Sequence, residues 1–130
     1  MRAIQIISLG LAASFSAANA HADLDTLSLA RIAAVEGRHA ECAELADKAR
    51  RQPNAVWHAH HVYATCQIFA TEARRGTLTG AEYSKAINKA REALQLLVRT
   101  PGLLATEEQR ASVEFVMEEL DKRIEAFEKP

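Results

Sequence analysis

The chain has 130 residues, with 16 basic and 17 acidic side chains and a formal net charge of −1 at pH 7. This near-neutral balance provides no basic field for nucleic acid, and a single domain of this length can bury a sufficient core. Aromatic residues make up only 5% of the sequence and alanines are frequent, so closely packed helices are expected.

Residues 1–22 have the layout of a secretory signal peptide. A positively charged start precedes an apolar run and a stretch of small residues with two A-x-A sites, so cleavage is expected after Ala20 or Ala22. The apolar run is shorter than the roughly 20 residues of a membrane span. We therefore expect a periplasmic or secreted protein with no membrane span after cleavage, whose single domain comprises residues 23–130.

The first three expected helices follow closely on one another. One runs from about 24 to 36 and ends at Gly37, which suits the left-handed conformation common after a helix. The second runs from about 39 to 51, and its stripe of small apolar side chains allows a neighbouring helix to come close. The third runs from about 55 to 74, with Asn54 expected to cap it.

The last two expected helices each begin with the spacing of a capping box. Thr79 and Glu82 form the first such pair, and Thr106 and Gln109 form the second. Both helices continue with apolar side chains at helical period, and no segment alternates with period two. The prediction is an all-α domain of two helical hairpins and a final helix.

The two cysteines, Cys42 and Cys66, are expected to form a disulfide. An even number of cysteines in an exported protein favours a bridge. Each cysteine lies 12 residues from Asn54, so an antiparallel hairpin around that residue brings both to the same level. Both also lie on apolar stripes, which allows the short separation that a disulfide requires.

The segment "EGRHAECAELADKARRQPNAVW" resembles part of a degenerate tetratricopeptide repeat. The matching positions are Gly37 at the helix turn, the small residues Cys42 and Ala49, Pro53 near the repeat end and Trp57 at the start of the next unit. Ala46 stands where the family has a larger residue. In the following unit, "AINKAREAL" repeats the small-residue spacing. The resemblance implies a short right-handed array of hairpins with a C-terminal capping helix, and a groove that binds a protein or peptide segment. A plain four- or five-helix bundle is the alternative.

The stretch "WHAHHVYATC" contains three of the five histidines and lies on the third expected helix. At about 100° per residue, this helix has two polar edges between two apolar stripes. One edge comprises His58, His61, Thr65 and Glu72, with Trp57 nearby. The other comprises His60, Gln67 and Thr71.

A metal site is the alternative interpretation of this stretch. His58 and His61 are i, i+3 neighbours that could offer two nitrogens to one zinc or copper ion, but no spacing singles out further ligands. The C-x-x-C-H motif of covalent haem is absent. We therefore predict no metal and no cofactor, and retain a small periplasmic metal-binding protein using these two histidines as the alternative.

The sequence contains no recognisable catalytic motif, since it lacks G-x-S-x-G, a P-loop and H-E-x-x-H. We therefore predict a non-catalytic module that binds a protein or peptide partner. This module would act as an adaptor, an assembly factor or an inhibitor. Its partner-binding edge is expected to comprise Trp57, His58, His61, Thr65 and Glu72. The residues predict neither the identity of the partner nor the oligomeric state.

Overall fold

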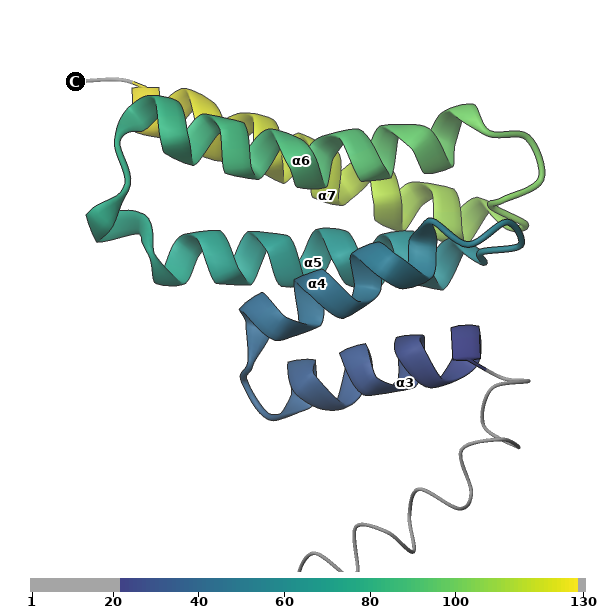
Figure 1. Ribbon diagram of the computed structural model, residues 1–130. Coiled ribbons are helices and arrows are strands. Elements are labelled where there is room, and N and C mark those ends of the chain that lie inside the picture. The colour runs from purple at the N-terminus through teal and green to yellow at the C-terminus, as the bar shows by residue number, and fades with distance from the viewer. Residues whose placement is uncertain (1–21, 129–130) are drawn as a thin grey trace, which may run out of the picture.

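The computed structural model describes residues 22–128, and this part of the chain is all-α, as predicted (Figure 1). Apart from Ala22, the expected signal peptide lies outside the described residues. The described elements are the helices α3 (Ala22–Val35), α4 (His39–Arg50), α5 (Trp57–Ala73), α6 (Gly80–Arg99) and α7 (Glu107–Glu128), and the 3₁₀ turn η2 (Arg75–Thr77).

Local signals for helix ends are confirmed at three of the four positions where they were expected. Gly37 has a φ of +82° directly after α3. Thr79 and Glu82 form both hydrogen bonds of a capping box at the start of α6. At the start of α7, the Gln109 N–H donates to Thr106 Oγ1, and the Thr106 N–H donates to Gln109 Oε1. These ends depend on neighbouring residues alone.

The predicted cap at Asn54 is wrong. The residue before the first turn of α5 is Val56, and no side-chain cap bond is made there. The reason lies in the connection, where the Ala55 N–H donates to the Gln52 carbonyl at 3.1 Å. This turn takes up Asn54, so the helix begins later than expected.

The helices pack mainly against their neighbours in the chain, and α3 also touches α5. In Figure 1, α4 lies in front of α5, and α6 lies in front of α7. Two groups of buried residues result. The N-terminal core consists of Ala30, Ala33, Cys42, Ala43, Ala46, Tyr63, Cys66 and Ala93. The C-terminal core consists of Ala64, Tyr83, Ile87, Ala90, Leu94, Leu97, Val113 and Leu120.

The predicted disulfide between Cys42 and Cys66 is confirmed. It joins α4 to α5 with a Cα–Cα separation of 5.9 Å, and both cysteines are buried. This separation lies within the usual range for a disulfide. The two helices are therefore antiparallel neighbours in the register expected from equal spacing about Asn54.

Within residues 22–128, no helix is both long enough and apolar enough to cross a membrane.

Candidate functional site: a groove between α4 and α6

A groove runs along the side of α5 that faces between α4 and α6. It consists of two adjoining hollows of about 320 and 440 Å³, which share Asp47, Tyr63 and Lys89. The first hollow is open because the side chains around it are short, and these are Ala40, Ala43, Ala70 and Ala86. Alanine at these helical positions leaves space that longer side chains would fill. We refer to this feature as the α4–α6 groove.

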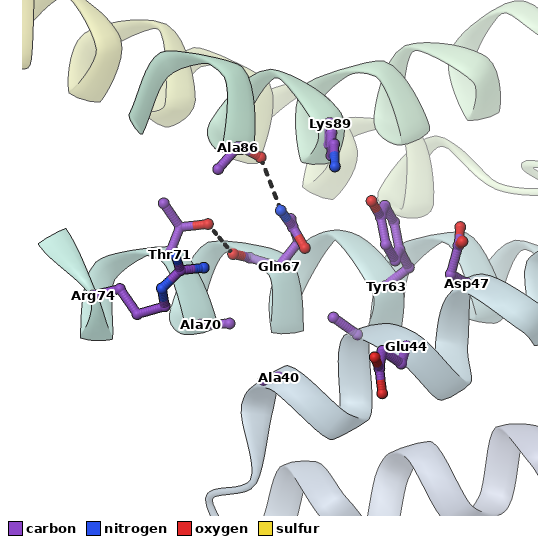
Figure 2. Close-up of a pocket in the computed structure, with 11 residues that line it drawn as sticks. Ala40, Glu44, Asp47, Tyr63, Gln67, Ala70, Thr71, Arg74, Ala86 and Lys89 are labelled. Carbon is purple, nitrogen blue, oxygen red and sulfur yellow. Dashed lines mark hydrogen bonds between the residues drawn. The ribbon is translucent and has the colours of Figure 1, made fainter. Parts of the chain in front are cut away.

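The floor of the groove is formed by Tyr63 and Gln67 of α5, one helical turn apart (Figure 2). The Gln67 Nε2 donates to the Ala86 carbonyl of α6 at 3.1 Å, which fixes the orientation of its amide. The Thr71 hydroxyl donates to the Gln67 carbonyl at 2.7 Å. The bond to Ala86 joins α5 to α6 and occupies the Gln67 side-chain amide, so this side chain is held in place before any ligand arrives. The bond from Thr71 lies within α5 and is made to the Gln67 backbone.

Tyr63 is held by charged residues of α4. The Arg50 guanidinium lies over its ring, 4.4 Å from the centroid, which is a favourable cation–π geometry. Arg50 in turn donates to Asp47 at 2.8 Å, and Arg51 donates to the other oxygen of Asp47 at 3.0 Å. Burial, and then the negative charge of Asp47, raise the pKa of the Tyr63 phenol. The hydroxyl therefore stays protonated at neutral pH and can donate a hydrogen bond.

Exposed charged side chains stand on both walls of the groove. Glu44 projects from α4, whereas Lys89 projects from α6, and Arg74 lies at the far end of α5. All three side chains are exposed, and none forms an ion pair with another residue in the described range. Glu92 of α6, which is also exposed, lines the second hollow, so the α6 wall carries both signs. The groove therefore offers charges of both signs to a ligand.

Three residues of the predicted partner-binding edge lie together at the start of α5. The Trp57 ring is 4.3 Å from the His58 ring and 5.4 Å from the His61 ring, measured between centroids. All three side chains are half-buried. Burial, and then the nearby His58, lower the pKa of the His61 imidazole. These three rings therefore form a partly packed aromatic cluster, in which His61 is harder to protonate than a free imidazole.

Glu72, from the same predicted edge, joins three elements near the other end of α5. It accepts hydrogen bonds from the Tyr83 hydroxyl of α6 and from Arg123 of α7, the latter at 2.9 Å. Arg75 of η2 is a further partner at 3.5 Å. Burial opposes ionisation of Glu72, but the bonds from Tyr83 and Arg123 outweigh it, so the pKa of the carboxyl is lowered. This carboxylate links helices within the fold.

The predicted edge and the groove lie on opposite sides of α5. At about 100° per residue, His61 and Glu72 point roughly 160–180° away from Tyr63. Trp57 and Glu72 are also about 22 Å apart along the axis, and Thr65 lies half-buried between them. The groove was not predicted from the sequence. The signal for it was the alternation of alanine with charged residues in "HAECAELAD" and "AINKARE".

The second polar edge of the expected helix is largely inside the protein. His60 is only 5% exposed and Thr71 only 3%, while Gln67 is half-buried. Among the described residues, none forms a hydrogen bond with His60 Nδ1. Burial, and then the positive charge of Arg50, lower the pKa of this imidazole. The packing of α4 and α6 against α5 therefore encloses residues that sequence pattern alone assigned to a polar edge.

His58 and His61 are the two residues of the alternative metal site. His60 lies on a different face of α5, as the helical spacing predicts. Among residues 22–128, no group of three or more His, Cys, Asp or Glu side chains is arranged to hold a metal ion. This pair alone would supply two of the four ligands that zinc usually takes in a structural site.

No family model matches this chain, and no curated protein or solved structure is significantly similar to it.

Proposed function

We propose that this protein is an exported, non-catalytic helical module that binds a segment of a protein or peptide partner in the α4–α6 groove. The observation that carries the proposal is the open groove itself, with a polar floor at Tyr63 and Gln67. On its walls, Glu44 and Lys89 have no ion-pair partner among residues 22–128. Binding in such a site could serve an adaptor, an assembly factor or an inhibitor.

Two further features support parts of this proposal. The Cys42–Cys66 disulfide fits an oxidising compartment such as the periplasm or the outside of the cell. The succession of two hairpins and a last helix fits a short tetratricopeptide-like array, in which every helix packs against the next one. Arrays of this kind expose extended grooves for protein segments.

Site-specific photo-crosslinking in cells that export the protein tests the proposal. A photoreactive phenylalanine analogue would replace Ala40 or Leu96, which are exposed, line the two hollows and carry none of the charges of the groove. As a control, it would replace Glu118 on α7, which is exposed and lies outside the groove. We expect the two groove positions to form an adduct of the same mass with one partner, and the control position to form none.

Adducts that form equally from all three positions would contradict the proposed binding site. The absence of any adduct from the groove, with adducts at Glu118, would place the interaction elsewhere. Mass spectrometry of the adduct would identify the partner, and cell fractionation of the same sample would test export.

A further inference from the structure

We infer that the partner segment bound in the α4–α6 groove carries clustered acidic side chains, which dock on a basic hollow at the end of α5. This inference rests on the proposed function and names the chemistry of the partner. It follows from an excess of positive charge around that hollow, which no carboxylate among residues 22–128 pairs.

The basic hollow has a volume of about 230 Å³ and continues the groove along α6. It shares Arg74, Ala86 and Lys89 with the alanine-lined first hollow, so one ligand can occupy both (Figure 2). Three basic side chains and one acidic side chain line it, which leaves a formal excess of two positive charges. The lining residues are Arg74, Leu78, Glu82, Lys85, Ala86 and Lys89.

The three basic side chains of this hollow are all exposed, and none has an ion-pair partner among residues 22–128. By contrast, Arg123 pairs with Glu72 at 2.9 Å. Lys85 and Lys89 are four residues apart on α6, so their like charges repel each other. An acidic ligand would replace this repulsion with ion pairs that the protein itself does not form.

Glu82 is the acidic residue of the hollow, and its carboxylate is held at the start of α6. Its Oε1 accepts a hydrogen bond from the Thr79 N–H at 2.9 Å as part of the capping box. A carboxylate in this position also interacts favourably with the positive end of the helix dipole. Because it is bound there and forms no ion pair with Lys85 in the described range, Glu82 leaves the three basic groups available.

The other two hollows have a smaller excess of positive charge. The first hollow is lined by two basic and two acidic side chains, and the second by three basic and two acidic ones. In the second hollow, Arg50 and Arg51 are already paired with Asp47, and the acidic Glu92 lies on α6. Electrostatic complementarity therefore directs the acidic part of a bound segment to the basic hollow.

Fluorescence anisotropy with three labelled octapeptides tests the inference. Each contains four alanines, together with four glutamates, four glutamines or four lysines. We expect the glutamate peptide to bind at least about fivefold more tightly than the glutamine peptide, and its binding to weaken as salt is added. The lysine peptide should bind no more tightly than the glutamine peptide. The backbone amide resonances of Arg74, Lys85 and Lys89 should shift with the glutamate peptide.

Variants that remove basic groups sharpen the test. Lys85→Gln combined with Lys89→Gln should weaken binding of the glutamate peptide by about fivefold, because two ion pairs with the ligand are lost. Arg99→Gln combined with Lys122→Gln is the matched control. It removes the same number of positive charges from exposed positions outside the three hollows, so it should leave binding nearly unchanged.

Equal binding of the glutamate and glutamine peptides would overturn the inference, as would an equal loss of binding in the two double variants. Displacement of the glutamate peptide by inorganic phosphate, but not by chloride at the same ionic strength, would assign the hollow to a small anion and would also overturn it. If partner adducts still form at Ala40 and Leu96 in these cases, the proposed function stands with a different partner chemistry. If those adducts are also absent, both proposals fail.

Discussion

The two halves of this molecule are held together by different means. The N-terminal core contains five alanines, one tyrosine and the two bridged cysteines, whereas the C-terminal core contains isoleucine, leucine, valine and tyrosine side chains. A fully buried leucine or isoleucine stabilises by about 1.5–3 kcal/mol, and an alanine by much less. The disulfide therefore compensates in the first half for apolar area that the second half obtains from larger side chains.

The difference also explains where the groove lies. Short side chains on α4 let that helix approach α5 closely, but they leave open space where α4 and α6 diverge. The disulfide holds α4 against α5 beside the alanine-lined hollow. The contact between these two helices therefore does not depend on large apolar side chains.

The largest effect is expected for Leu94→Ala in the C-terminal core. Leu94 is fully buried, so its truncation should lower the free energy of unfolding by about 4 kcal/mol through lost apolar burial and the cavity left behind. Urea unfolding at pH 7 measures the change. Leu96→Ala is the matched control on the same helix, because Leu96 is 44% exposed, and it should cost less than about 1 kcal/mol. Similar losses for both variants would show that this core does not depend on its large side chains.

Removal of the disulfide is expected to have the next largest effect. Cys42→Ala combined with Cys66→Ala should lower the free energy of unfolding by about 3 kcal/mol, because the bridge closes a loop with a sequence separation of 24 residues. Hydrogen exchange should rise more in α3 and α4 than in α6 and α7, since only the first half relies on the bridge. A uniform rise across all the helices would contradict the comparison.

The features that could be predicted from the sequence depend on short-range chemistry or on simple symmetry. The capping boxes at Thr79 and Thr106 are complete within four residues. Gly37 adopts its positive φ because glycine has no side chain to clash with the backbone. The disulfide could be predicted because Cys42 and Cys66 are equally far from Asn54, in the connection between the two helices. The groove and the burial of His60 could not be predicted, because they depend on the angle at which α4 and α6 leave α5. Glu72 likewise finds Arg123, 51 residues away, only in the folded chain.

Glu72→Gln tests a polar contribution to the C-terminal half. The variant should lose about 1 kcal/mol at pH 7, because Arg123 and Arg75 would face a neutral group. Since the folded-state pKa of Glu72 is lowered from 4.5, its contribution is present above that pH and is lost as the pH falls through the lowered value. Between pH 7 and 3, the free energy of unfolding measured in urea should therefore decline less steeply in the variant than in the wild type. Glu119→Gln, at an exposed pair with Lys122, should leave the decline unchanged.

His60 provides a smaller pH effect at the boundary between the halves. Burial and the nearby Arg50 lower its pKa from 6.5 in the folded protein, so the unfolded chain takes up a proton first and stability falls as the pH drops below that value. His60→Leu should flatten the decline in the free energy of unfolding between pH 7 and 5. His58→Leu, on the same helix, should retain most of it. Parallel pH profiles for the wild type and His60→Leu would contradict this prediction.

The smallest expected effect is that of added metal. The disulfide, and not a metal ion, is expected to hold the N-terminal half together. Zinc or copper should leave the Tm unchanged, because His58 and His61 supply only two ligands and pack against Trp57. Differential scanning fluorimetry of the wild type and of the variant with His58→Ala and His61→Ala, each with and without metal, measures this. A ligand of the native state raises the Tm by mass action. A metal-dependent rise that only the wild type shows would therefore favour a metal site that includes His58 and His61 over the groove as the functional site.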